Sequence, residues 1–268
     1  MFWINGVEQN LISASDRSVQ FGDGCFTTAR VSLGRVVWLD KHILRLQSAV
    51  ERLLMPAVNW NALTKEMIEA ASHTEDGVLK VIISRGSGGR GYSGTACQHP
   101  TRIISLSDYP AHYHSWRERG ISLALSPISL ARSPLLAGVK HLNRLEQVLI
   151  RAHLDQTAAD EALVLDTDGM LVECCAANLF WRKGDEILTP DLRQSGVDGI
   201  MRQRIITCLA NHGRQVTIVA QPVDVLADAD EVIVCNALMP LLPVNRAEQW
   251  VYHSRQLFDF LNQHCCEA

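Results

Sequence analysis

The sequence predicts an α+β fold with two domains, residues 1–110 and 111–268. Strand-like apolar segments and helix-like segments are mixed along the whole chain rather than alternating regularly. A length of 268 residues is sufficient for two domains of ordinary size. The pattern breaks at Asp108-Tyr109-Pro110-Ala111-His112, and we therefore expect the domain boundary there.

The first half predicts a strand-rich domain with two helices. Asp40 offers an N-cap to a helix whose apolar residues Ile43, Leu46, Val50 and Leu53 recur every three or four positions, and Pro56 ends this helix. A second helix is expected over 63–71. Strands are expected at 3–7, 26–33, 35–39, 78–84 and 101–107, the second and third forming a hairpin around Leu33-Gly34. A glycine-rich loop, 85–92, follows the fourth.

The second half predicts more strands and two helices. Asn143 and Glu146 have N-cap and N3 spacing for a helix that turns Leu145, Val148, Leu149 and Ala152 inward. Another helix begins near Gly199. Strands are expected at 121–125, 161–165, 171–173, 178–181 and 186–188, and near Val216 and Val232.

Composition excludes several function classes. Hydrophobic residues make up 47% of the chain and the formal net charge is −4, without a basic block, which argues against nucleic acid as a partner. No apolar run has the length of a membrane span, and Met1–Gly6 lacks the features of a secretory signal, so we expect a cytoplasmic protein. The eight cysteines form no C-x-x-C pair, and neither the tail cluster His264, Cys265, Cys266 nor His112-x-His114 predicts a functional metal site.

Lysine is scarce, which allows an elimination among five residues. Lys41, Lys65 and Lys183 occupy positions typical of solvated charges, and Lys80 in its strand is interpreted as an edge charge. Lys140 lies among apolar neighbours in Leu135–Leu142, where a desolvated amine could form an imine. A surface lysine with a buried stem remains the alternative.

Three further features could bind an anion or hold a charge. Glu173 sits in an apolar strand pair beside small residues, so it is either a buried carboxylate with a partner or a solvent-facing strand end. The helix start at Asp198–Arg202 could bind phosphate through its N–H groups, and Asn236-Ala237 could add donors. Arg45 on an inner helix suggests a held anion.

Five ordered motifs then match a family. Together they resemble the fold-type IV pyridoxal-phosphate enzymes, which comprise branched-chain and D-amino-acid aminotransferases and related lyases. The motifs are Phe21–Thr28, His42–Leu46, Lys140–Asn143, Glu173–Phe180 and Gly199–Met201. Within the family, three segments (85–92, 138–147 and 235–240) are similar to the lyases that make 4-aminobenzoate. Many relatives carry serines where this chain has Cys174, Cys175 and Ala176, which leaves local hydrogen bonds to the cofactor open.

The resemblance implies pyridoxal 5'-phosphate, bound in a cleft between the two domains. Lys140 would carry the cofactor as a Schiff base, and Glu173 would keep its ring nitrogen protonated. The implied phosphate ligands are Arg45 and the N–H groups of Ile200, Met201, Asn236 and Ala237.

The implied reaction converts 4-amino-4-deoxychorismate to 4-aminobenzoate and pyruvate in a homodimer. Lys140 would act as the base, and Thr28 would assist the departing enolpyruvate oxygen, whereas Thr27 on the opposite strand face would not. β-Propensity alone also explains the threonine pair. Arg90 and Arg85 are candidate clamps for the substrate carboxylates, or ordinary loop charges. An aminotransferase and a non-catalytic carrier of the cofactor remain alternatives.

Overall fold

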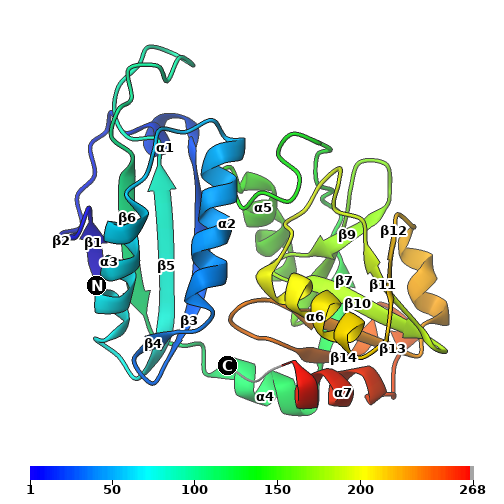
Figure 1. Cartoon of the computed structure of the whole chain (residues 1–268). Coiled ribbons are helices and arrows are strands. Elements are labelled where there is room, and N and C mark those ends of the chain that lie inside the picture. Colours follow the sequence, from blue (N-terminus) through cyan, green and yellow to red (C-terminus); the bar gives the residue numbers. More distant parts are fainter. Residues whose placement is uncertain (266–268) are drawn as a thin grey trace. The chain divides into compact units, whose positions relative to one another are not determined.

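The computed structural model describes residues 1–265 and divides the chain into two compact units (Figure 1). The first unit contains residues 1–110 together with Lys140–Asn143. The second contains Ala111–Val139 and, of the described residues, 144–265. The segment Lys140–Asn143 therefore belongs structurally to the first unit, although it follows a part of the second in sequence.

A six-stranded sheet forms the first unit, in the order β2-β1-β6-β5-β3-β4. Its longest pairing joins β3 and β5 antiparallel over nine residues each. The strands are β1 (Phe2–Ile4), β2 (Val7–Glu8), β3 (Gly24–Ser32), β4 (Arg35–Val36), β5 (Asp76–Ser84) and β6 (Thr101–Ser107). Because β5 lies between β3 and β6, the expectation that Lys80 is an edge charge is wrong; Lys80 is exposed on a face of the sheet.

Three helices accompany this sheet: α1 (Arg17–Phe21), α2 (Leu39–Arg52), which packs on β3, and α3 (Trp60–Ala71). The N-cap of α2 is Trp38, which makes no side-chain cap bond, so the assignment of Asp40 as the cap is wrong; Asp40 lies in the first turn, where its charge suits the helix dipole. Leu46 and Val50 are buried as predicted, together with His42 and Ala49. Ile43 and Leu53 are only half-buried.

The second unit is built on a nine-stranded mixed sheet, in the order β12-β11-β10-β13-β14-β7-β8-β9, with β15 beside β14. The strands are β7 (Ile121–Leu125), β8 (Glu161–Leu165), β9 (Leu171–Cys174), β10 (Asn178–Lys183), β11 (Glu186–Pro190), β12 (Val216–Val219), β13 (Glu231–Cys235), β14 (Leu242–Ala247) and β15 (Trp250–Val251). The helices are α4 (His112–Arg119), α5 (Leu145–Leu154), α6 (Ile200–Asn211), η1 (Val223–Asp228) and α7 (Gln256–His264). The sequence did not predict α4, β14, β15, η1 or α7.

Helix α5 corrects two expectations. Ile150 and Leu154 form its buried face and join a core cluster with β8 and β9, whereas Leu145 is 77% exposed and Val148 and Leu149 are also exposed. The expected capping box is absent, because the N-cap is Arg144 and the Glu146 carboxylate accepts from Ala131 N at 2.8 Å instead. An apolar face therefore lies on the surface of α5.

The described residues contain neither a helix that could cross a membrane nor a metal-ligand cluster. Cys266, part of the tail cluster considered above, lies outside the described residues. None of the seven cysteines within residues 1–265 forms a disulfide.

Candidate functional site

Lys140 is held against the start of β3. Phe26 N donates to Lys140 O at 2.9 Å, and two residues later Leu142 N donates to Gly24 O at 3.0 Å. A Cβ at Gly24 would lie 2.3 Å from Ile83 O and 2.9 Å from a methyl carbon of Leu142, so glycine is what allows the two segments this close. The backbone of Lys140 is thereby fixed, although it lies outside any helix or strand.

One face of β3 and β5 gathers the candidate catalytic groups. The Lys140 Nζ lies 4.7 Å from the centre of the Phe26 ring, and Lys80 Nζ lies 5.1 Å from the same ring. Thr28 is directly opposite Lys80 in the antiparallel pair, so it shares their face, two residues after Phe26. The structure thus brings Lys140 and Thr28 to the same side of one sheet.

Thr27 points to the other side. Its side chain is fully buried, and its Oγ1 lies 2.6 Å from Nδ1 of the equally buried His42 on α2. Burial, helped by the charge of Arg45 one helical turn away, lowers the pKa of His42 to about 3. His42 is therefore neutral and structural at physiological pH, and Arg45 lies half-buried close to it. Sequence reasoning used His42 only as part of a motif.

The two loop arginines differ. Arg85 donates to the Asp23 carboxylate at 2.7 Å and to the carbonyls of Leu53 and Leu54 at 2.8 and 2.7 Å. These contacts favour a structural role for Arg85 over a substrate clamp. Arg90 is exposed at the tip of the glycine-rich loop, where its guanidinium can meet a ligand.

Glu173 is a buried carboxylate, not a solvent-facing strand end. It is 5% exposed within β9, and its Oε2 accepts from Val197 N at 2.8 Å. Gly196, with φ of 85°, makes this contact possible because a Cβ there would lie 3.2 Å from Oε2 and 2.6 Å from Val172. Arg144, which the sequence did not single out, is half-buried nearby: desolvation lowers its pKa, and Glu173 and Glu146 oppose that shift.

The start of α6 presents N–H groups that no side chain of the N-cap residue binds. Gly199 is its N-cap and supplies no side chain, so the first amides, including those of Ile200 and Met201, are suited to an anion. Asn178 fixes the preceding turn by donating to Val197 O at 2.9 Å, and a Cβ on Gly199 would lie 2.0 Å from its Oδ1.

A second turn follows β13. Asn236 Oδ1 accepts from Leu238 N and Met239 N at 2.8 Å each, and its Nδ2 donates to Ala176 O at 3.0 Å. The Asn236 N–H itself donates to Met239 O at 3.1 Å, so the turn uses one of the two amides that the resemblance assigns to phosphate. The amide of Ala237 is the better donor of the pair.

Glu161 is a buried acid that sequence reasoning missed. It is 4% exposed and accepts from Ala162 N at 2.8 Å and Ala176 N at 3.2 Å. Burial raises its pKa to about 7, against the effect of these backbone donors. A single acid opening the apolar strand Ala162–Leu165 was the only available signal.

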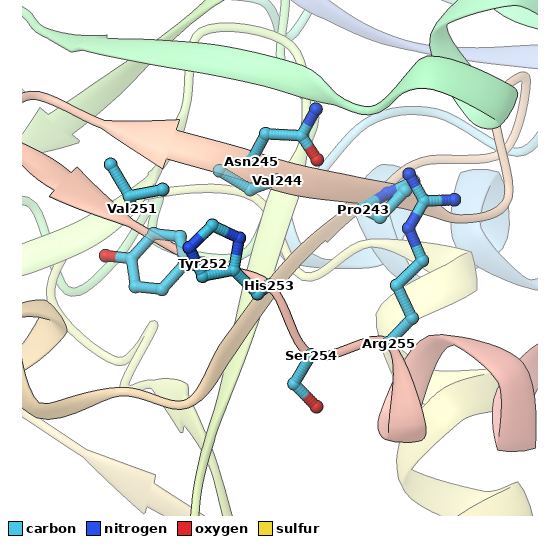
Figure 2. A pocket seen from close by; sticks show the side chains of 8 residues that line it. All are labelled: Pro243, Val244, Asn245, Val251, Tyr252, His253, Ser254 and Arg255. Atoms are coloured by element: carbon cyan, nitrogen blue, oxygen red, sulfur yellow. The ribbon is translucent and has the colours of Figure 1, made fainter.

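A separate cavity of about 350 Å³ lies elsewhere in the second unit (Figure 2). It is lined by Pro243, Val244, Asn245, Val251, Tyr252, His253, Ser254 and Arg255. None of the predicted site residues lines it, so we do not assign the reaction to this cavity.

The fold and these groups define a class of protein before any particular relative is considered: a two-unit α+β protein with a fixed lysine, a buried carboxylate and a glycine-capped helix start. The chain belongs to the amino-transferase class IV family, whose sequence model matches residues 24–247. This confirms the family and the fold class that the motifs predicted.

Particular relatives refine the comparison. The chain is 39% identical to an aminodeoxychorismate lyase of Vibrio harveyi over 91% of this chain and 90% of that protein. The crystal structure of 4-amino-4-deoxychorismate lyase from Pseudomonas aeruginosa is similar with a TM-score of 0.92 and 36% identity, covering 98% of both chains. A D-alanine aminotransferase of Bacillus licheniformis is 26% identical over 87% of this chain and 82% of that protein.

Proposed function

We propose that the protein is a pyridoxal-phosphate-dependent lyase that converts 4-amino-4-deoxychorismate to 4-aminobenzoate and pyruvate. The observation that carries this proposal is the likeness to two lyases of that name over nearly the whole chain, at 39% and 36% identity. The aminotransferase named above is more distant, at 26%.

The residues fit the cofactor. Pyridoxal phosphate supplies an electron-accepting ring that stabilises negative charge at the carbon next to the bound amine. Lys140 would hold the cofactor through its amine, and the buried Glu173 would supply a carboxylate for the ring nitrogen. Arg45 and the amides of Ile200, Met201, Asn236 and Ala237 are the proposed phosphate ligands, with Ala237 favoured over Asn236 in the second turn.

Proton transfer is the task of the chain's own groups. The Lys140 amine would take the proton from the carbon that bears the substrate nitrogen. The Thr28 hydroxyl, on the same sheet face, donates a hydrogen bond to the departing enolpyruvate oxygen. Because the six-membered ring of the substrate becomes aromatic when enolpyruvate departs, the elimination is effectively irreversible. Arg90 binds a substrate carboxylate.

The second candidate function is that of an aminotransferase on the same scaffold. The 26% identity to a D-alanine aminotransferase supports this alternative. Release of pyruvate from 4-amino-4-deoxychorismate by purified protein, without any 2-oxo acid, distinguishes the two. A requirement for an oxo-acid acceptor would favour the aminotransferase. If the protein binds the cofactor but shows neither lyase nor aminotransferase turnover, the result would favour a non-catalytic carrier of the cofactor.

Lys140→Ala tests the assignment of the amine. The wild-type protein should show an absorption band at about 410 nm that borohydride abolishes, as expected of a Schiff base. The variant should lack this band and nearly all activity, because both the imine and the base are removed. Turnover within about tenfold of wild type would contradict the assignment and make Lys80, which lies over the same Phe26 ring, the next candidate.

We also propose a cytoplasmic homodimer. The exposed apolar residues Leu145, Val148 and Leu149 on α5 support a self-associating surface. The seven described cysteines without disulfides are compatible with a reducing compartment. Sedimentation of the purified protein measures the oligomer directly.

A further inference from the structure

We propose that Arg17 is a positioning residue that fixes the glycine-rich loop at residues 86–94 and thereby places Arg90 for substrate binding. The part of this inference that concerns substrate rests on the proposed function, whereas the part that concerns the loop does not. The contacts that carry it lie within the first unit.

The guanidinium of Arg17 donates hydrogen bonds to the loop and to the Asp23 carboxylate. The residue is 4% exposed, and its Nε donates to the Asp23 carboxylate at 2.7 Å. Three consecutive loop carbonyls accept from its other nitrogens: Gly91 O at 2.9 Å and Ser93 O at 3.4 Å from Nη1, and Tyr92 O at 3.2 Å from Nη2. A buried cation that binds three neighbouring carbonyls fixes the path of that backbone.

The loop is shaped to close over this guanidinium. Ser93 N donates to Arg90 O at 3.2 Å, which closes a turn. Gly89 has φ of 78°, and a Cβ there would lie 2.0 Å from Ser93 O, so only glycine allows this close approach. The Phe21 ring completes the contact, because Arg17 lies 4.7 Å from its centre and the Tyr92 ring lies 5.6 Å from it.

The start of the loop is tied to the same short segment. Arg17 N donates to Gly86 O at 3.0 Å, and Asp16 forms a bridge with Ser87. Arg17 therefore contacts the loop at its entry through the backbone and at its tip through the side chain. Arg90 lies between these two attachments, with its own side chain exposed. Displacement of the tip would move Arg90.

Arg85 provides a matched comparison. It shares the Asp23 carboxylate with Arg17 at the same 2.7 Å, but its remaining donors bind Leu53 and Leu54 at the end of α2. Replacing either arginine by lysine removes a planar fork that a single ammonium cannot reproduce. Only the Arg17 replacement releases the carbonyls of the loop tip.

The first test is limited trypsin digestion, in which the fragment cut after Arg90 is measured by mass spectrometry in protein without substrate. Losing charge-assisted bonds of this kind corresponds to a change of about tenfold or more in the population of the open loop. We expect Arg17→Lys to be cut after Arg90 about tenfold faster than wild type, and Arg85→Lys at the wild-type rate. Equal rates for wild type and Arg17→Lys would overturn the proposal.

The second test is the split between KM and kcat in pyruvate release. Arg17→Lys should raise KM about tenfold with kcat within about threefold, because the bonds at the reacting atoms are unchanged. Faster cleavage with an unchanged KM would overturn the substrate part of the inference. If the wild type releases no pyruvate, the proposed function and this substrate part fail, while the cleavage result still decides the role of Arg17 in the loop.

Gly89→Ala guards against a folding defect in Arg17→Lys. It leaves Arg17 and Asp23 intact and acts in an exposed loop, yet its Cβ must displace Ser93 O. We expect the same two changes, faster cleavage after Arg90 and a higher KM. Wild-type values of both in this variant would contradict the idea that the position of the tip matters.

Discussion

Two adjacent threonines on β3 should have opposite roles, and valine separates them. Valine keeps the branched shape and the strand preference and removes only the hydroxyl. In Thr27→Val the 2.6 Å bond to His42 Nδ1 is lost inside the core, and the His42 Nε2 already has no partner within the described residues. A buried group left without its partner costs about 1–3 kcal/mol. We expect about 2 kcal/mol, or roughly thirtyfold in the unfolding equilibrium.

Thr28→Val should show the reverse. Thr28 is only half-buried and shares its face of the sheet with Phe26 and Lys80. The free energy of unfolding of Thr28→Val should therefore stay within about 0.5 kcal/mol of wild type. Pyruvate release should slow at least about tenfold if the hydroxyl assists the leaving oxygen. The cofactor absorption band should be unchanged.

Two assays on both variants decide the matter: urea unfolding for stability and pyruvate release for activity. The reasoning requires that Thr27→Val changes mainly the unfolding midpoint and that Thr28→Val changes mainly the rate. Wild-type pyruvate release by Thr28→Val would mean that another group, Lys140 or a bound water, protonates the leaving oxygen. Equal loss of stability in both variants would refute the assignment of faces.

Three other predictions follow from the same geometry. Glu173→Gln should still bind the cofactor but slow turnover by orders of magnitude, since an amide cannot hold a ring proton as a carboxylate does; steady-state rates and the spectrum check this. Arg45→Ala should weaken cofactor affinity about tenfold to hundredfold, and titration of the apoprotein with pyridoxal phosphate would show equal affinity if Arg45 were only a surface charge. The folded-state pKa of His42, about 3, lies below its unfolded value near 6.5, so the unfolded state binds the extra proton and the contribution of His42 to stability should fall as pH drops below 6.5, by about 1.4 kcal/mol per pH unit. The unfolding free energies of wild type and His42→Leu should be compared across this pH range. The raised pKa of Glu161 changes stability with pH in the opposite direction, but it does so in both proteins and therefore cancels in their difference.

Strands were predicted better than helices, for a physical reason. A strand gives a short apolar or alternating pattern that can be recognised locally, and the predicted bounds 101–107, 121–125 and 161–165 match β6, β7 and β8; β8 is buried almost throughout, whereas β6 and β7 are partly exposed. Apolar periodicity in a helix shows that a face is apolar but not what covers it. On α5 the predicted inward face is exposed, and α4, which has no buried residue, gave no periodic signal at all.

In the candidate site, too, local features could be predicted from the sequence, whereas contacts between distant segments could not. Alternation along β3 separated Thr27 from Thr28 correctly, because that rule is local. The acid bridge of Arg17, Asp23 and Arg85 could not be seen, because it joins residues 62 positions apart in one of its bonds and only the fold brings them together. Glu161 was missed for the same reason, since its partner Ala176 lies on another segment.

Cys174, Cys175 and Ala176 stand where the family resemblance suggests serines, and the bonds that hold the backbone at Ala176 do not involve these three side chains, although Cys175 Sγ donates to Gln147 O at 3.6 Å. This backbone is held from both sides: the Glu161 carboxylate accepts from Ala176 N, and Asn236 Nδ2 donates to Ala176 O. The thiols also stay neutral, because burial raises the pKa of Cys175 to about 12 and that of Cys174 well above its usual value. They therefore add no negative charge beside Glu173. Two cysteines and an alanine supply no hydroxyl donors and no charge next to the buried carboxylate, while the backbone bonds at Ala176 remain, so any loss relative to serine would concern direct bonds to the cofactor rather than the architecture that holds it.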